Sequence, residues 1–245
     1  KEGGFDCVIG NPPYVVIGDD IYPKSIIDYF RTYSVARYKS DLFHLFIQRS
    51  IELLAPNGRF GYIVPNPWLT QKYTGELRKF ILNKVAISEV VVFDHFVFQS
   101  ANVHTALIFI ENKLPEAKHE VRVKKPKEEA SLSCIEKANV SFVPQQSWLE
   151  NEGFCFETRL LGNHADIVAK ILKNWPALKS VARASLGCQA YNKSKHTAKQ
   201  IANRVFHAKY KAGKDYLPEL AGKDINRYII EKKRGEWIKY GAWLH

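Results

Sequence analysis

The chain has 245 residues, enough for one large domain or two modest ones. It has neither an apolar run near the roughly 20 residues that cross a bilayer nor a signal peptide, so we expect a cytoplasmic protein without a membrane segment. Its four cysteines form no Cys-x-x-Cys pair and have no histidine at metal-ligand spacing, which argues against a metal site and against a disulfide framework.

The net charge of +11 is distributed unevenly along the chain. Residues 1–170 contain equal numbers of basic and acidic side chains, whereas residues 171–245 contain 16 basic and 5 acidic ones. A neutral front part followed by a basic tail predicts a polyanion-binding module attached to a neutral domain. The alternative is a solvated basic surface without a specific partner.

Residues 1–112 predict alternating strands and helices. A short apolar strand at Phe5–Ile9 must end at the prolines that follow it, because proline cannot continue a strand ladder. A helix is expected over residues 24–38, and Asp41 is the expected N-cap of a second helix. The remaining expected elements are a strand at Arg59–Val64, a helix at Thr74–Asn83 and two β-rich runs at Ile87–Phe93 and Val103–Ile110.

The last two runs are close enough to pair as an antiparallel hairpin. Strand–helix alternation that ends in such a hairpin predicts an α/β fold whose sheet is mainly parallel with an antiparallel edge. Residues 113–147 are predicted to be a linker or peripheral strands, and residues 148–245 a second, loop-rich α+β domain with a helix at His164–Asn174. The chain contains no methionine, so we expect a piece of a longer polypeptide whose second domain is incomplete.

The residues with the clearest chemistry form a polar loop, Asn11-Pro12-Pro13-Tyr14, directly after an apolar strand. Such a loop lies at the carboxyl edge of a sheet, where open α/β sheets bind ligands. One reaction that such a loop could assist is methylation of an aromatic amine. This amine is a poor nucleophile, because its lone pair is delocalised into the ring. The Asn11 side-chain oxygen and the Pro12 carbonyl are two acceptors for its N–H groups, and the fixed φ of proline limits where that carbonyl points. Tyr14 offers a flat face on which a base stacks.

The strand and loop together, Phe5-Asp6-x-x-x-Gly10-Asn11-Pro12-Pro13-Tyr14, resemble the catalytic motif of amino-group DNA methyltransferases. Later blocks are similar, in the same order, to those of the large (type IIG-like) restriction–modification methylases. They are Asp41-Leu42-Phe43-x-Leu45-Phe46, Leu53-Leu54-x-Pro56-x-Gly58, Tyr62-Ile63-Val64-Pro65, Val97-Phe98 through Val103 and Thr105, and Gly222-Lys223-Asp224-Ile225-x-Arg227-Tyr228. Several ordered matches are more specific than any one of them.

This resemblance implies an enzyme of a restriction–modification system that methylates the exocyclic amine of an adenine extruded from double-stranded DNA, with S-adenosylmethionine as the methyl donor. It implies a partial Rossmann-like methyltransferase sheet in residues 1–112, with the loop at residues 11–14 as its catalytic motif. Phe98 would be the second stacking face for the base, opposite Tyr14. Residues 148–245 would be the target-recognition domain.

In this family the donor lies on a glycine-rich turn after the first strand of the sheet. Gly3-Gly4 has no strand before it and no helix after it, so it is not that turn. We therefore expect the main donor-binding motifs to lie outside this chain, with Asn11 as a candidate donor contact, and we expect the fragment alone to be inactive.

The basic tail supplies candidates for DNA contacts, mostly with phosphates. They are Tyr191, Asn192, Lys193, Lys195, Lys199, Arg227, Lys232, Lys233 and Arg234. Asn192 and Arg227 are the candidates for contacts with base edges. Two alternatives stay open at this stage: a methyltransferase that acts on protein glutamine or RNA, and a non-catalytic DNA specificity module.

Overall fold

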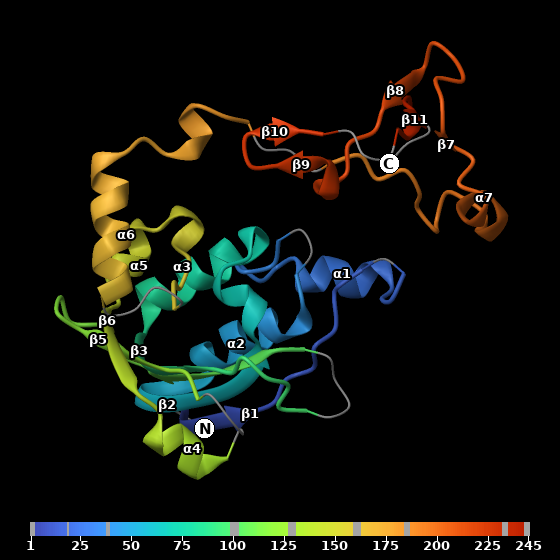
Figure 1. Cartoon of the computed structure of the whole chain (residues 1–245). Helices are drawn as coiled ribbons and strands as arrows, with labels where there is room; N and C mark the ends of the chain where they lie inside the picture. Colours follow the sequence, from blue (N-terminus) through green and yellow to red (C-terminus); the bar gives the residue numbers. More distant parts are fainter. Residues whose placement is uncertain are drawn as a thin grey trace. The chain divides into compact units, whose positions relative to one another are not determined.

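A computed structural model of the protein describes residues 3–18, 20–37, 40–98, 103–126, 131–158, 163–183, 187–231 and 235–242. The chain divides into two compact units, Lys1–Trp175 and Pro176–His245 (Figure 1). The elements of the first unit are β1 (Phe5–Gly10), α1 (Lys24–Phe30), α2 (Leu42–Leu53), β2 (Leu54–Pro65), η1 (Asn66–Leu69), η2 (Lys72–Thr74), α3 (Gly75–Lys84), β3 (Ala86–Val92), β4 (Thr105–Glu111), β5 (Glu120–Lys124), α4 (Leu132–Lys137), β6 (Val140–Pro144), α5 (Ser147–Glu150), η3 (Glu152–Phe154) and α6 (Asn163–Asn174). Among the described helices, none is both long and apolar enough to cross a membrane.

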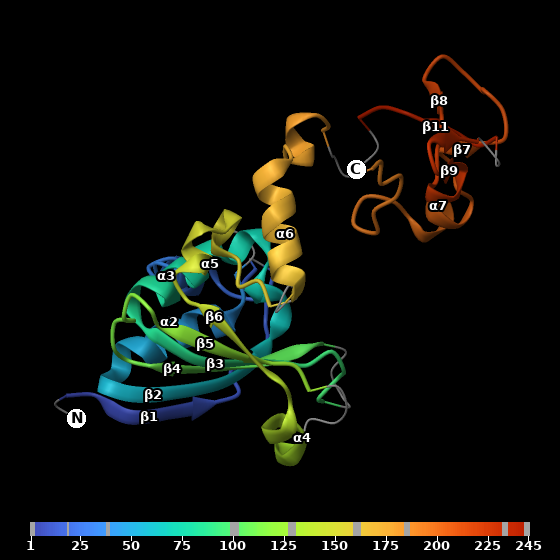
Figure 2. The same ribbon diagram turned by 60° about the vertical axis from the view of Figure 1, so that its left-hand side comes forward.

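The first unit is built on a six-stranded sheet with the order β1-β2-β4-β3-β5-β6 (Figures 1 and 2). β1 is parallel to β2 and β3 is parallel to β5, whereas the β2–β4, β3–β4 and β5–β6 pairs are antiparallel. The predicted hairpin is the β3–β4 pair, but it lies inside the sheet and not at its edge, because β3 also pairs with β5. The antiparallel edge is the β5–β6 pair. Because most of the described pairs are antiparallel, the sheet is mixed and not mainly parallel as predicted. The predicted α/β fold is confirmed.

Helices α2 and α3 lie against one face of this sheet (Figure 2). The strands show the alternation that such a layer requires. In β4, Ile108 and Ile110 are buried, whereas Phe109 between them is 36% exposed on the opposite face. In α3, Leu77 and Ile81 are one turn apart and fully buried. The main core of the protein therefore lies between the sheet and these helices.

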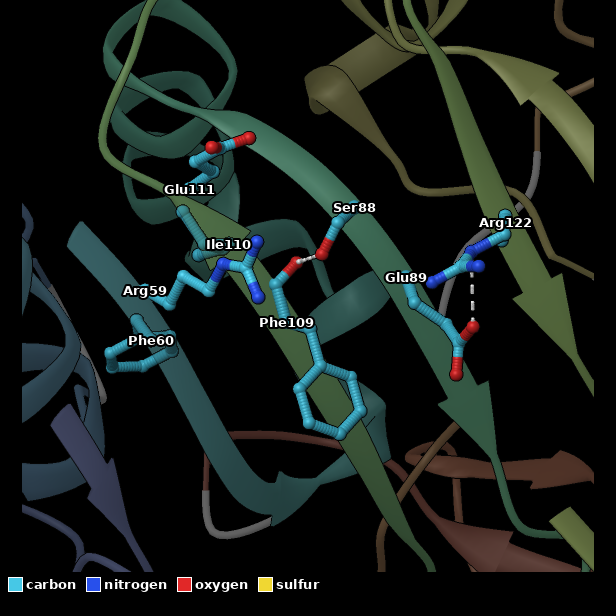
Figure 3. Close-up of a pocket in the computed structure, with 8 residues that line it drawn as sticks. All are labelled: Arg59, Phe60, Ser88, Glu89, Phe109, Ile110, Glu111 and Arg122. Atoms are coloured by element: carbon cyan, nitrogen blue, oxygen red, sulfur yellow. Dashed lines mark hydrogen bonds and ion pairs between the residues drawn. The ribbon is translucent and has the colours of Figure 1, made fainter. Parts of the chain in front are cut away.

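The opposite face of the sheet carries a hollow of about 380 Å³ that crosses β2, β4, β3 and β5 (Figure 3). Glu89 of β3 lies in it, with its Oε2 atom 3.2 Å from Arg122 Nε and 3.3 Å from Lys124 Nζ. Because opposite charges on neighbouring strands stabilise a sheet, these ion pairs support the parallel contact between β3 and β5.

Helix α1 ends at Phe30 and is therefore shorter than the helix predicted over residues 24–38. Further along, the Val35 N–H donates to Oε1 of Gln48 in α2 at 3.1 Å. This side-chain acceptor replaces the backbone carbonyl that a longer helix would offer to the same N–H. The residues after Phe30 consequently form turns that pack against α2.

The first unit extends past residue 148, where the sequence predicted the second domain to begin. β5 and β6 come from the segment predicted to be a linker or peripheral strands, and both belong to the sheet. Beyond them, Trp148 and Phe156 are buried in the same core with their rings stacked at 4.5 Å, and Trp68 meets Phe156 edge-on at 5.3 Å. The division between compact units falls after Trp175 because these aromatic residues complete the core of the first unit.

The second unit consists of short elements joined by loops, in agreement with the predicted loop-rich α+β fold. They are η4 (Leu178–Ser180), α7 (Ala198–Ala202), β7 (His207–Ala208), β8 (Tyr216–Pro218), η5 (Gly222–Asp224), β9 (Ile225–Asn226), β10 (Ile229–Ile230) and β11 (Trp237–Lys239). β7, β11 and β8 form an antiparallel sheet in that order, and β9 pairs with β10 as a separate hairpin. Among the described apolar side chains of this unit, Ile238 alone is buried, so its core is small.

A buried arginine, Arg78 of α3, joins three segments of the first unit. Its guanidinium group donates to the carbonyl oxygens of Trp68, Gln71 and Gly153, the last two at 2.9 Å and 2.7 Å. Burial lowers the pKa of Arg78, but a guanidinium group stays protonated in proteins. These carbonyl groups therefore satisfy a buried positive charge and hold the turns before α3 and the segment after α5 together.

We predict that Arg78→Met destabilises the protein by roughly 3 kcal/mol, because three carbonyl groups lose their donor at a buried position. Urea unfolding followed by tryptophan fluorescence measures the change. Arg31→Met, at a side chain that is 67% exposed, is the matched control and should change stability by less than about 0.5 kcal/mol. Equal stability of the Arg78 variant and the wild type would contradict this role.

Candidate active site

Three connections of the first unit meet at one edge of its sheet. β1 and β2 are parallel, with Gly10 opposite Tyr62, so the loops after these strands leave the sheet at the same edge. β4 is antiparallel to β2, and its first residue, Thr105, lies opposite Pro65 at the end of β2. Because β3 is also antiparallel to β4, the β3–β4 connection begins and ends at this edge. This is the edge where the sequence predicted a ligand site.

The Asn11-Pro12-Pro13-Tyr14 loop leaves β1 at this edge, with Asn11 exposed and Tyr14 half-buried. Tyr14 Oη donates to the carbonyl oxygen of Ile63 in β2 at 3.0 Å. The Tyr14 ring meets Phe43 of α2 edge-on, with ring centroids 6.2 Å apart. Burial raises the pKa of Tyr14 to about 12, so the hydroxyl stays neutral at physiological pH and continues to donate. The orientation of the ring is therefore fixed by the sheet and by α2.

Gly10 determines how closely β1 approaches β2 directly before this loop. A Cβ atom at Gly10 would lie 2.7 Å from Cε1 of Tyr62, closer than non-bonded atoms approach. The Tyr62 ring cannot easily move away, because its hydroxyl is hydrogen-bonded at 2.7 Å to the buried hydroxyl of Ser50 in α2. Sequence reasoning gave Gly10 no role of its own. The available signal was a glycine as the last residue of a strand, which often marks a close backbone approach.

The residues after the loop are attached to the start of α2. Val16 and Asp41 form an isolated antiparallel bridge, and the Leu42 N–H donates to the Val15 carbonyl at 2.9 Å. Asp41 is the N-cap of α2, as predicted, and its N–H donates to Nδ1 of His44 at 3.2 Å. The loop is thus held at both ends, by β2 before Asn11 and by the N-terminus of α2 after Tyr14.

His44 supports this attachment only while its ring is neutral. Burial, with a smaller contribution from the positive charge of Arg78, lowers the pKa of His44 to about 4. The ordinary value is 6.5, so between pH 6.5 and 4 the unfolded chain binds more protons than the folded chain. Stability that is present above pH 6.5 is therefore lost as the pH falls through this window. Burial raises the pKa of Asp41, which acts in the opposite direction at the acidic end.

We predict that His44→Gln makes folding less sensitive to acid. Glutamine keeps an acceptor for the Asp41 N–H, as in a capping box, and does not titrate. Between pH 7 and 4, protonation of His44 in the unfolded chain should cost the wild type about 3 kcal/mol of stability. The variant should not show this loss. Urea unfolding of both proteins across this range checks it, and their difference cancels the contribution of Asp41. Parallel stability curves would show that His44 does not titrate as described.

The β3–β4 connection brings further aromatic residues to this edge. Phe96 stacks on His104 with ring centroids 4.6 Å apart, and the Asn66 N–H after β2 donates to the His104 carbonyl at 2.8 Å. Phe98 is half-buried in the same connection, and its role as a second stacking face stays a prediction. Trp68, in the segment after Asn66, is buried in the core.

Two predicted DNA contacts of the second unit are engaged within the protein. The Tyr191 hydroxyl accepts the Phe206 N–H at 3.1 Å and lies 2.8 Å from Nδ1 of His207. The side-chain oxygen of Asn192 accepts the Ser194 N–H at 2.8 Å. These groups shape the loop before α7, so a contact of either residue with DNA would use its remaining atoms.

The other predicted DNA contacts of this unit are charged. Lys193, Lys195, Lys199 and Arg227 are exposed, whereas Lys232, Lys233 and Arg234 lie outside the described residues. In the described part of the chain, no group of three or more His, Cys, Asp or Glu side chains could hold a metal ion.

We predict that Gly10→Ala destabilises the protein by about 1–3 kcal/mol, because the added methyl group overpacks the contact with Tyr62. Gly187→Ala is the matched control, since a Cβ atom there meets nothing within 4 Å. Thermal and urea unfolding of both variants provide the comparison. If the Gly10 variant were as stable as the Gly187 variant, the close approach of the two strands would not be a real constraint.

The structure places the Asn-Pro-Pro-Tyr loop at the carboxyl end of β1, where the sequence predicted it. Residues 1–98 match the Eco57I restriction-modification methylase family. The resemblance to restriction–modification methylases is confirmed over this segment.

Individual relatives agree with this match. Over 112 residues the chain is 34% identical to the type II restriction enzyme and methyltransferase RM.Eco57I of Escherichia coli, an alignment that covers 44% of this chain and 11% of that protein. Over 243 residues it is 28% identical to the putative type II restriction enzyme and methyltransferase RM.MjaORFECS2P of Methanocaldococcus jannaschii, which covers 98% of this chain and 19% of that protein. The chain thus spans less than a fifth of either relative.

Among solved structures, the type IIL restriction-modification enzyme MmeI, in complex with DNA, has a similar fold. The TM-score is 0.50 at 12% sequence identity, and the match covers 96% of this chain and 29% of that one. At this identity the similarity concerns the fold alone.

Proposed function

We propose that the whole protein is a DNA methyltransferase of a restriction–modification system that uses S-adenosylmethionine to modify the exocyclic amine of adenine. The observation that carries the proposal is the exposed Asn11, which begins a loop held on both sides at the sheet edge where three connections meet. The match of residues 1–98 to restriction-modification methylases supports the same class of reaction.

The loop provides what an unreactive aromatic amine needs. The Asn11 side-chain oxygen and the Pro12 carbonyl accept its two N–H groups, which favours a pyramidal nitrogen with a more available lone pair. Tyr14, whose ring is oriented by its hydrogen bond to Ile63, offers a stacking face for an extruded base. These residues act by positioning and electrostatics, and no covalent enzyme intermediate is required.

S-adenosylmethionine, when bound, supplies an electrophilic methyl group. The described residues include groups that could bind the amine, but they include no glycine-rich turn that could bind the donor. Gly4, a residue of the one glycine pair before β1, has a φ of 86°, and a Cβ atom there would lie 2.7 Å from the backbone nitrogen of Ala55. This glycine therefore has a packing role against β2, and we derive no step through the donor.

We propose that the donor-binding residues belong to the rest of the protein and lie next to β1. Within the described residues, β1 is the outer strand of the sheet, and its side chains Phe5 and Ile9 are 48% and 82% exposed. Apolar side chains next to a catalytic loop are normally covered. Of the residues of this chain, Asn11 is the candidate for a contact with both substrate and donor.

The second unit supports DNA as the substrate through its charge. Residues 176–245 contain 15 basic and 5 acidic side chains. The acidic ones are engaged internally: Asp215 with Lys239, Glu219 with His207, Asp224 with the Ala221 N–H, Glu231 with Asn226 and Glu236 with Arg204. Basic side chains therefore outnumber acidic ones three to one in this unit, a charge balance that favours binding to phosphates.

We predict that Asn11→Ala in the full-length protein lowers DNA methylation by at least about 100-fold, because one of the two acceptors for the amine is lost. The measurement is the N6-methyladenine content of plasmid DNA from cells that express each protein, determined by mass spectrometry of its nucleosides. Asn66→Ala is the matched control, since Asn66 also precedes a proline after a strand at the same edge, and it should retain most of the activity.

Other products would identify other functions. N4-methylcytosine in place of N6-methyladenine would keep the amine chemistry and refute the choice of base. Methylated RNA or protein glutamine with unmodified DNA would refute DNA as the substrate. A wild-type protein that binds DNA and methylates nothing would be a specificity module.

A further inference from the structure

An exposed tyrosine stands at the tip of the β9–β10 hairpin in the second unit. Asn226 pairs with Ile229, so Arg227 and Tyr228 form a two-residue turn. Tyr228 is 91% exposed and has a φ of 64°. Bulky residues rarely adopt this left-handed conformation, which glycine or asparagine would adopt with less strain. The tyrosine therefore does not stabilise the turn, and we infer that its side chain has a role outside the hairpin.

The base of this hairpin is rigid. The Glu231 N–H donates to the carbonyl of Asp224 at 2.7 Å, and Nδ2 of Asn226 donates to Oε2 of Glu231 at 2.9 Å. Asp224 itself is 1% exposed, and its Oδ2 atom accepts the Ala221 N–H at 2.8 Å. An aromatic side chain on such a base loses little conformational freedom when it binds a partner.

The surface around Tyr228 combines apolar and positively charged groups. The three isoleucines of the hairpin, Ile225, Ile229 and Ile230, are 59%, 57% and 65% exposed. The Arg227 guanidinium lies 5.3 Å from the centroid of the Tyr228 ring. Both acidic residues next to the turn, Asp224 and Glu231, form hydrogen bonds at its base. Apolar exposure of this extent on a two-stranded hairpin marks an interaction surface.

We propose that the hairpin at residues 225–230 is a DNA-contacting element in which Tyr228 packs against bases and Arg227 binds phosphate or base acceptors. This inference rests on the proposed function, and it names the element that touches the substrate. The positive charge of the second unit favours a polyanion over a protein partner. Apolar side chains inserted beside cationic ones are a known means of separating stacked bases. An aromatic side chain can stack on any base. Tyr228 therefore contributes to DNA affinity and base extrusion, and other residues recognise the DNA sequence.

The test uses the full-length protein and a fluorescein-labelled DNA duplex of mixed sequence, with binding followed by fluorescence anisotropy. Tyr228→Gly removes the aromatic ring and the backbone strain together. If Tyr228 had only a structural role, this substitution would therefore stabilise the protein and leave DNA binding unchanged. We expect binding at least about tenfold weaker, with unchanged or higher thermal stability and an unchanged salt dependence. Tyr228→Phe should bind like the wild type. Arg227→Ala should reduce the slope of log K against log salt by about one.

Tyr210→Ala is the matched control, since Tyr210 is a tyrosine of the same unit that is 71% exposed, and it should leave affinity unchanged. Wild-type affinity of Tyr228→Gly would overturn the assignment of the hairpin. So would protection of the turn amides of Arg227 and Tyr228 from hydrogen exchange before DNA is added, because the tip would then dock on protein. In either case, methylation that depends on Asn11 would leave the proposed function intact. Failure of the wild type to bind DNA would instead refute the proposed function itself.

Discussion

The candidate site depends on the parallel contact between β1 and β2, where the absence of a side chain at Gly10 leaves room for the Tyr62 ring. This contact fixes the last residue of β1 against a tyrosine that α2 holds through Ser50. The next residue of β2, Ile63, offers its carbonyl to Tyr14. Two successive residues of one strand therefore position both the start and the end of the Asn-Pro-Pro-Tyr loop. The loop gains its rigidity from packing and backbone hydrogen bonds.

The two units handle charge in different ways. In the first unit, basic and acidic side chains are balanced and form short-range pairs across strands, such as Glu89 with Arg122. Near the Asn-Pro-Pro-Tyr loop, burial keeps Tyr14 protonated and His44 deprotonated at physiological pH, so both side chains are neutral. In the second unit the acidic side chains form ion pairs or hydrogen bonds within the unit, and basic side chains are in excess. The proposed function assigns the amine to the loop of the first unit and the phosphates to the basic second unit.

Much of the first unit follows from local pattern. Apolar strands ended by prolines or glycines and helices with a 3.6-residue period gave the element order, and the N-cap at Asp41 is confirmed. The end of α1 could not be predicted, because it depends on Gln48, a residue of another helix that accepts the Val35 N–H. The boundary of the unit was also hidden, since only the tertiary contact of Phe156 with Trp68 shows that this late segment completes the core.

For the site, the sequence predicted the loop at residues 11–14 and its place at the edge of a sheet. It could not predict the neighbours that hold the loop, because Tyr62 and Ser50 are brought to Gly10 by strand register and helix packing. In the second unit, Tyr191 and Asn192 were chosen for their chemistry, and their internal hydrogen bonds depend on contacts with Phe206, His207 and Ser194 that pattern alone does not reveal.

The bond between Arg78 and the Gly153 carbonyl has a consequence for exchanging the second unit between related proteins. It ties the chain beyond β6 to the turns that precede α3, so the first unit needs its own residues at least up to Gly153. A chimera that imports a foreign segment from residue 148 onward would remove the Gly153 carbonyl that accepts from the buried guanidinium group and would replace both rings of the Trp148–Phe156 stack. A junction between Trp175 and Pro176 keeps both, and is the natural seam for exchanging such regions between relatives.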